Sequence, residues 1–195
     1  AWTDDRRTVF LKVAHDRELL GIVELTGFGG PDRRDHDLNL ALGLAQSGAS
    51  VGLLDADIYG PSVPLLLGLH GPPEVDAAGR LVPMPAHGLR VMSLGLVAGE
   101  GAPVIWRGPL LAQALQRFLG QVSWGAVDYL VVDLPPGTGD VVLTLCQSVE
   151  LAGAVMVTTP QDVALQDVER GIAMFRRVDV DVLGGKSNLT DIAAA

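Results

Sequence analysis

Short apolar runs alternate along this chain with longer stretches in which apolar residues recur at helical spacing. The apolar runs predict strands over residues 22–26, 50–54, 90–94, 129–133, 153–158 and 180–184. The helical spacing predicts helices over residues 34–47, 109–120, 141–149 and 163–178. Strands that are apolar on both faces are typical of a parallel sheet covered by helices on each side. The pattern therefore predicts an α/β fold with a doubly wound, mostly parallel sheet.

The chain is interpreted as one folded unit preceded by an extension. Residues 1–20 form the predicted N-terminal extension, and residues 21–195 form the predicted domain. With 48% hydrophobic residues among 195, the chain can bury one sizeable core. Residues 71–89 are rich in glycine and proline and interrupt the alternation, so we interpret them as an excursion with a small hairpin around residues 80–84.

Charge and the length of the apolar runs narrow the class of partner. The formal net charge of -9 and the pI near 4.7 disfavour nucleic acid and anionic membrane surfaces, because both would repel this protein. No apolar run approaches the ~18 residues that a membrane-spanning helix needs. The single cysteine, Cys146, cannot form a disulfide within the chain. We expect a cytoplasmic protein that holds any phosphate ligand locally.

Acidic residues close two of the predicted strands. Asp133 ends one apolar run, and Asp55 ends another, with Asp57 two residues later. An acid at such a position is suited to hold Mg²⁺ beside the phosphates of a nucleotide, usually through water. Strand alternation would direct Asp55 and Asp57 to the same side, so that one neighbours the metal while the other orients an attacking water. Capping of a turn is the alternative role for these two acids.

The segment after Asp133 is stiff at its prolines and pliable at its glycines. Its residues are Pro135, Pro136, Gly137, Thr138, Gly139 and Asp140. Small changes at a phosphate can be amplified by a hinged segment of this kind. We interpret these residues as a switch loop that senses the terminal phosphate of a nucleotide.

Glycines follow the first predicted strand at the position of a phosphate-binding turn. They are Gly27, Gly29 and Gly30. Backbone N–H groups in such a turn can point at phosphate oxygens. Together with Asp55 at the end of the next strand, these glycines also imitate the fingerprint of a dinucleotide-binding Rossmann domain. A dinucleotide oxidoreductase is therefore a remote alternative.

Four motifs carry a resemblance to a known family. They occupy residues 51–64, 104–109, 128–140 and 158–165. In order and spacing they resemble the Mrp/ApbC family of iron–sulfur cluster carrier ATPases, relatives of MinD and ParA with a deviant Walker A loop. The resemblance implies a P-loop NTPase fold, incomplete here at its C-terminal end. It also implies ATP and Mg²⁺ as ligands, a homodimer, and delivery of iron–sulfur clusters to acceptor apoproteins.

The loop that would bind phosphate departs from the family pattern. The family's Gly-Lys-Gly-Gly-Val-Gly-Lys-Ser-Thr lies on residues 27–35, where only the three glycines are kept. Phe28 replaces the lysine that reaches the nucleotide of a partner subunit. Because the mismatch is confined to residues 28–37, we hypothesise a compensated reading-frame slip, which the coding DNA would test.

Four further replacements alter the expected phosphate contacts. Pro31 lacks a backbone N–H, and Asp32 adds a negative charge where the family has glycine. Repulsion between that charge and a phosphate ~4 Å away is roughly 4 kcal/mol at an effective dielectric of about 20. Arg33 stands at the phosphate-contacting lysine, and Arg34 at the hydroxyl residue that ligates Mg²⁺. We expect nucleotide binding through Arg33 and Arg34 with impaired hydrolysis; a catalytically inactive nucleotide-binding or scaffold protein is the alternative.

Beyond the last predicted strand, the resemblance assigns one residue and finds a pair missing. Asn188 aligns with the residue that reads adenine, with which an amide can pair at two points. A turn-forming asparagine is the alternative. Relatives place a Cys-x-x-Cys pair just after this point, whereas the sequence ends at Ala195 without one. Ligands for an iron–sulfur cluster are therefore absent here, and we expect the chain to be truncated.

Overall fold

The computed structural model describes residues 21–26, 36–57, 62–98, 108–134, 140–149, 151–158 and 162–187. Its strands are β1 (Gly21–Thr26), β2 (Val51–Asp55), β3 (Met84–Ala86), β4 (Leu89–Ser93), β5 (Tyr129–Asp133), β6 (Gly153–Thr158) and β7 (Val182–Ser187). Its helices are α1 (His36–Gln46), α2 (Val63–Leu67), α3 (Leu94–Ala98), α4 (Gly108–Gln121), α5 (Asp140–Ser148) and α6 (Asp162–Arg177). None of these helices is both long and apolar enough to cross a lipid bilayer. The predicted extension, residues 1–20, lies outside the described residues.

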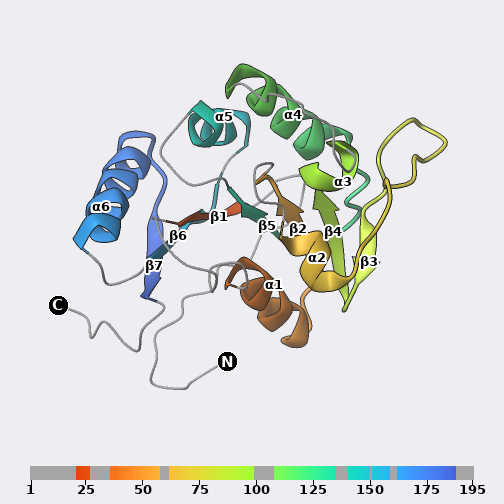
Figure 1. Cartoon of the computed structure of the whole chain (residues 1–195), viewed down its shortest axis with the longest axis horizontal. Helices are drawn as coiled ribbons and strands as arrows, with labels where there is room; N and C mark the ends of the chain where they lie inside the picture. The colour runs from red at the N-terminus through yellow and green to blue at the C-terminus, as the bar shows by residue number, and fades with distance from the viewer. Residues whose placement is uncertain are drawn as a thin grey trace.

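The described strands form one seven-stranded sheet in the order β3-β4-β2-β5-β1-β6-β7. All neighbouring pairs are parallel except β3 and β4. Figure 1 shows α4 and α5 on one face of this sheet and α1 on the other. Parallel strands need crossover connections, and helices on both faces supply them. The predicted doubly wound, mostly parallel α/β fold is confirmed.

Alternate side chains of the central strands enter two separate apolar layers. Leu53 of β2 and Val131 of β5 pack with Leu38, Ala41 and Leu44 of α1. Successive side chains of a strand point to opposite faces, so the residues next to Leu53 and Val131 face away from α1. The strands are therefore buried on both faces, which is why they are continuous apolar runs in the sequence.

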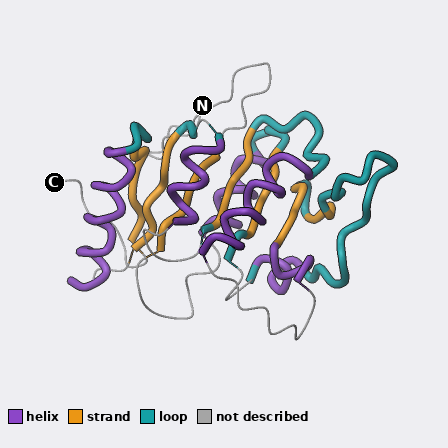
Figure 2. Tube along the Cα trace, turned by 90° about the horizontal axis from the view of Figure 1, so that it is seen from above, coloured by secondary structure: helices purple, strands orange, loops and turns teal. Residues whose placement is uncertain are grey.

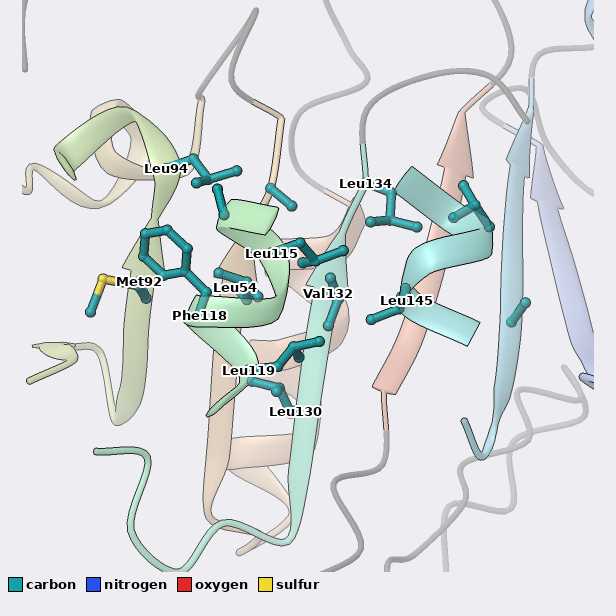
Figure 3. Close-up of a cluster of buried hydrophobic side chains, with 14 of the residues drawn as sticks. Leu54, Met92, Leu94, Leu115, Phe118, Leu119, Leu130, Val132, Leu134 and Leu145 are labelled. Carbon is teal, nitrogen blue, oxygen red and sulfur yellow. The ribbon is translucent and has the colours of Figure 1, made fainter. Parts of the chain in front are cut away.

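The opposite face is covered by α4, α5 and α6. Figure 3 shows Leu115 of α4 and Leu145 of α5 packed beside Leu54 and Val132 of the sheet. Phe175 of α6 is fully buried and belongs to the same apolar cluster. This cluster contains more buried side chains than the one beneath α1, and it supplies most of the described core.

Most predicted elements are confirmed, with ends displaced by a few residues; β5 and β6 have the predicted bounds. β7 begins after Asp181 instead of at Val180, because a turn containing Asp179 with φ 58° first ends α6. The short helices α2 and α3 were not predicted. For α2 the signals were present, since it has proline in its first turn and ends at Gly68 with φ 64°.

The predicted hairpin around residues 80–84 is wrong in position. Val75 and Leu81 form an antiparallel bridge across a turn, in which Asp76 accepts hydrogen bonds from the backbone N–H groups of Ala78 and Arg80. A second hairpin follows, formed by β3 and β4 with its turn at residues 87–88. The predicted hairpin at residues 80–84 therefore falls between the two observed turns. Figure 2 shows the excursion as an extended loop at the β3 edge of the sheet.

Candidate functional site

The carboxyl ends of the central strands meet at one edge of the sheet, and three polar residues lie there in register. Ser93 of β4 is the register partner of Asp55 of β2, and Asp55 is the register partner of Asp133 of β5. Because Leu53 and Val131, two residues earlier, face α1, Asp55 and Asp133 lie on that same face. Two of the acids predicted to form the site therefore end adjacent strands on one face.

Asp55 is fully buried, and both oxygens of its carboxyl group accept hydrogen bonds. Oδ2 accepts one from Ser93 Oγ at 3.0 Å, and Oδ1 accepts one from the backbone N–H of Asp57 at 3.1 Å. Burial raises the pKa of Asp55 to about 7, because the charged form loses its hydration; the hydrogen bond from Ser93 opposes the rise. Near neutral pH, protonated and ionised Asp55 therefore coexist in the absence of a bound cation.

Asp37 belongs to the same site, although no role was assigned to it from the sequence. It lies in the first turn of α1 and is only 3% exposed. Its negative charge raises the pKa of Asp55, so the two carboxyl groups interact. Residues 37, 41 and 44 share one face of a helix, and the last two are apolar core residues. This spacing was the signal that placed Asp37 against the sheet.

Asp57 reaches the site by a different route from the predicted one. β2 ends at Asp55, so strand alternation does not extend to Asp57. A turn begins instead, in which the Asp55 carboxylate accepts the N–H group two residues on. Asp57 is half-buried and lies near enough to add to the rise in the pKa of Asp55. The predicted role of Asp57, to orient an attacking water, therefore depends on the position that this turn gives it.

Asp133 is half-buried, and its backbone ties the two acidic strand ends together. The carbonyl oxygen of Asp133 accepts a hydrogen bond of 2.8 Å from the N–H of Ala56, just past the end of β2. Asp140, the last residue of the predicted switch loop, begins α5. The other residues of that loop lie outside the described residues: Pro135, Pro136, Gly137, Thr138 and Gly139.

The residues predicted to contact the nucleotide directly also lie outside the described residues. They are Gly27, Gly29, Gly30, Arg33, Arg34 and Asn188. The segment with the glycines and arginines connects β1 to α1. Since Asp37 in the first turn of α1 interacts with Asp55, the beginning of α1 lies at the acidic site.

The donor set fits a hydrated Mg²⁺ ion better than a metal enclosed by protein ligands. Within the described ranges, no group of three or more His, Cys, Asp or Glu side chains can hold a metal ion together. Mg²⁺ prefers oxygen donors and keeps several of its waters, so carboxylates at the ends of adjacent strands suit it. A cation would also offset the cost of ionising buried Asp55. Asp55 and Asp133 are the residues that would hold it.

The strand order distinguishes this fold from a Rossmann domain. β5 lies between β1 and β2 and pairs with both. In the Rossmann order the first two strands are direct neighbours. The dinucleotide oxidoreductase considered from the glycines is therefore wrong. The strand that carries Asp133 lies beside the strand that precedes the glycine loop, and this arrangement defines a P-loop nucleotide-binding domain of the α/β class.

Comparison with known families agrees with this class. A family model described as ParA, the NUBPL iron-transfer P-loop NTPase, matches residues 20–194. The chain belongs to this family. The resemblance drawn from the four motifs is thereby confirmed.

Curated relatives share about half of their residues with the chain where they align. An iron–sulfur cluster carrier protein of Aquifex aeolicus is 53% identical over 166 residues, which cover 84% of this chain and 46% of that protein. The iron–sulfur cluster transfer protein NUBPL of Dictyostelium discoideum is 48% identical over 164 residues, 83% of this chain and 51% of that protein. The chain thus spans about half the length of these relatives.

Solved structures share the fold. A nucleotide-binding protein from Archaeoglobus fulgidus, determined in complex with ADP, superposes with a TM-score of 0.73 at 38% identity over 86% of this chain and 65% of that one. MinD in the MinC:MinD complex of Aquifex aeolicus reaches a TM-score of 0.57 at 21% identity, over 86% of this chain and 67% of that one. The second likeness concerns the fold alone.

Proposed function

We propose that this chain is the nucleotide-binding part of an iron–sulfur cluster carrier, which binds ATP with Mg²⁺ at the carboxyl edge of its sheet. The observation that carries the proposal is the register pairing of Asp55 with Asp133 on adjacent central strands. The names of the relatives support the carrier role, and the ADP complex of a related protein supports the nucleotide. Delivery of clusters to acceptor apoproteins and a cytoplasmic location are parts of the same proposal.

Three acids divide the work at the proposed site. Asp133 and Asp55 would hold the waters of a Mg²⁺ ion, which would supply positive charge beside the β and γ phosphates. Asp57 is the proposed catalytic residue and orients the attacking water. Ionised Asp55 is the form that would hold the cation, whereas burial favours the protonated form.

The remaining nucleotide contacts come from three segments named from the sequence: residues 27–34, residues 135–140 and the segment with Asn188. Gly27, Gly29 and Gly30 offer backbone N–H groups to phosphate, and Arg33 and Arg34 offer charge. Asn188 pairs with adenine, and the loop from Pro135 to Asp140 responds to the terminal phosphate. Asp32 and Pro31 weaken the phosphate contacts, so hydrolysis by this chain is expected to be impaired.

The cluster is cargo and not a resident cofactor of this chain. A cluster held by protein needs several cysteine thiolates, and the sequence contains one cysteine. That residue, Cys146, lies half-buried on α5, where burial raises the pKa of its thiol. Cluster binding therefore requires ligands beyond those in this sequence, and we propose, from the family resemblance, that the carrier forms a homodimer.

A restored-loop variant tests the proposed nucleotide site. It carries Phe28→Lys, Pro31→Val, Asp32→Gly, Arg33→Lys, Arg34→Ser and Asp35→Thr. We expect it to bind ATP with Mg²⁺ about a thousandfold more tightly than the parent chain, since relief of the Asp32 repulsion alone corresponds to that factor. Isothermal titration measures the affinity, and phosphate release measures hydrolysis. If the restored variant binds no ATP, the proposed site is wrong.

The catalytic assignment is tested in the same background. Asp57→Asn in the restored-loop variant should retain ATP affinity and lose at least about 100-fold in hydrolysis rate, because it removes the group that orients water. Asp76→Asn is the matched control, since Asp76 lies in the excursion and bonds Ser123 instead of the site. Equal hydrolysis by the Asp57→Asn variant and its parent would remove Asp57 from the mechanism.

A second candidate function is a nucleotide-binding scaffold without turnover. Two arginines in the loop favour it, because guanidinium groups bind phosphate without requiring a metal. This candidate predicts that the parent chain binds ATP equally well with Mg²⁺ and with EDTA. Binding that depends on Mg²⁺ contradicts it.

A further inference from the structure

Ser93 occupies a position in the site to which the proposed function gives no role. It is the last residue of β4 and is fully buried. The four buried polar or charged residues of the described chain are Asp37, Asp55, Ser62 and Ser93. Two of them end neighbouring strands, and the other two lie at the beginnings of α1 and α2. Of these four described residues, Asp37, Asp55 and Ser93 belong to the proposed site.

The hydroxyl group of Ser93 is engaged on both sides. Its proton is donated to Asp55 Oδ2 at 3.0 Å, and its oxygen accepts the backbone N–H of Gly95, in α3, also at 3.0 Å. A serine hydroxyl has one proton and two acceptor lone pairs, so it can donate to ionised Asp55 while it accepts the N–H of Gly95 on one lone pair. Rotation of this hydroxyl would leave buried polar groups without partners, which is unfavourable.

The constraint continues from Asp55 to Asp57. Oδ2 of Asp55 accepts from Ser93 while Oδ1 accepts the N–H of Asp57, so the two hydrogen bonds together restrict the plane of the carboxylate. Gly95, Ser93, Asp55 and Asp57 thus form a continuous chain of hydrogen bonds from α3 to the two acids. The other residues of β4 near this end, Val91 and Met92, are apolar core residues, so the hydroxyl is a local exception.

We propose that Ser93 is a positioning residue, which orients the Asp55 carboxylate and, through it, the turn that presents Asp57 to the metal-bound nucleotide. The nucleotide in this proposal rests on the proposed function, whereas the orientation of Asp55 rests on the hydrogen bonds. Loss of a residue that hydrogen-bonds to a metal-binding carboxylate typically lowers the metal affinity about 10- to 100-fold.

The test compares Ser93→Ala, which has no donor, with Ser93→Cys, a weak donor, and Ser93→Thr, which keeps the hydroxyl. Ser50→Ala is the matched control, because it removes a hydroxyl that donates to Ala126 O at the opposite edge of the sheet. Mn²⁺ serves as the probe, and its affinity in the presence of ATP is measured by electron paramagnetic resonance. We expect about a tenfold loss for Ser93→Ala, a smaller loss for Ser93→Cys, and parental affinity for Ser93→Thr and Ser50→Ala.

A second measurement needs no nucleotide. Carboxyl ¹³C resonances of labelled Asp55 and Asp57 should move in the Ser93→Ala variant at fixed pH and return with Ser93→Thr, because the hydroxyl sets their environment. Both resonances should stay in place in the Ser50→Ala variant. Unchanged resonances in the Ser93→Ala variant overturn the proposal. If the parent binds Mn²⁺ with ATP, an equal Mn²⁺ affinity in the Ser93→Ala variant overturns it as well.

The two measurements separate this inference from the proposed function. If the parent chain takes up no Mn²⁺ with ATP, the proposed nucleotide site fails in this chain, and the carboxyl resonances then decide the role of Ser93. Movement of both resonances with recovery in Ser93→Thr supports the positioning role. Movement without that recovery attributes the change to altered packing and overturns the role.

Discussion

The fold and the proposed chemistry favour different charge states of the Asp55 carboxyl group. It is fully buried, and its pKa is raised to about 7, mainly by that burial and in part by the charge of Asp37. A carboxyl group in this environment destabilises the fold once it is ionised. The ionised carboxylate is, however, the form that would hold a hydrated cation. Opposition of this kind is a common property of functional sites.

The pH dependence of stability should report Asp55. Unfolded aspartate has a pKa of 3.8, whereas folded Asp55 keeps its proton until about pH 7. Its contribution to stability is therefore complete below about pH 4 and is lost as the pH rises through 7, by on the order of 4 kcal/mol. Asp55→Asn removes this dependence, so we expect a higher urea midpoint than the parent at about pH 8 and a flatter profile from about pH 4 to 7.

The control for this experiment is Asp128→Asn. Asp128 lies at the opposite edge of the sheet, where it accepts the N–H of Ser50 at 2.8 Å. This variant should keep the decline in stability between about pH 4 and 7 that the parent shows. Identical profiles for Asp55→Asn and the parent would contradict the effect of burial.

Close packing around Gly52 gives a second prediction at the residue scale. A Cβ at this position would lie 2.9 Å from Leu130 Cδ1 and 3.0 Å from Trp124 Cε3. We expect Gly52→Ala to destabilise the fold by about 1 to 3 kcal/mol through overpacking, as measured by chemical denaturation. Gly43→Ala on α1 is the control, since a Cβ there meets nothing within 4 Å. That variant should be neutral or more stable by up to about 1 kcal/mol, because alanine favours helix; a similar loss in both variants would contradict the packing argument.

At the scale of single elements, local sequence was sufficient where an apolar run had clear ends. The strand Tyr129–Asp133 ends at a charged residue, with two prolines beginning two residues later, and its bounds were predicted correctly. The hairpin of β3 and β4 was placed wrongly because its turn depends on His87, a residue with no strong turn preference. Only the backbone shows that residue at φ 49°.

The turn at His87 gives a prediction at this scale. His87 and Gly88 both have positive φ, 49° and 81°, as in the two central residues of a type I′ turn. Asparagine tolerates this conformation better than histidine, so His87→Asn should raise stability by about 0.5 kcal/mol in thermal unfolding. Gly88→Ala is the opposite test and should lower stability by about 1 kcal/mol or more. A loss in His87→Asn would contradict the assigned turn.

At the scale of the whole molecule, the order of the strands creates the site. β5 lies between β1 and β2, so the strand with Asp133 touches both the strand before the glycine loop and the strand with Asp55. α4 and α5 pack over one face of these strands, and α1 over the other (Figure 1). Ligand binding at this edge should therefore stabilise the packed domain as a unit.

Ligand-linked stability tests that expectation. In the restored-loop variant, ATP and Mg²⁺ at about 100 times the dissociation constant should stabilise the fold by about 2.7 kcal/mol. For a chain of this size this corresponds to a rise in Tm of roughly 5 to 10 °C. Asp133→Asn should reduce the part of the rise that depends on Mg²⁺, and leave the rise with ATP and EDTA unchanged. If the Mg²⁺-dependent rise in Tm is the same with and without Asp133→Asn, a metal role for Asp133 is contradicted.

The sequence by itself determined most of the longer elements, the α/β class and the acids at the strand ends, because apolar periodicity and terminal residues are local properties of the chain. The tertiary structure alone decided that Asp55 and Asp133 are register partners, that Ser93 donates to Asp55, and that Asp37 is buried beside them. These contacts join residues far apart in the chain. They depend on which strands become neighbours, and strand order follows from the packing of helices on both faces, which no local pattern encodes.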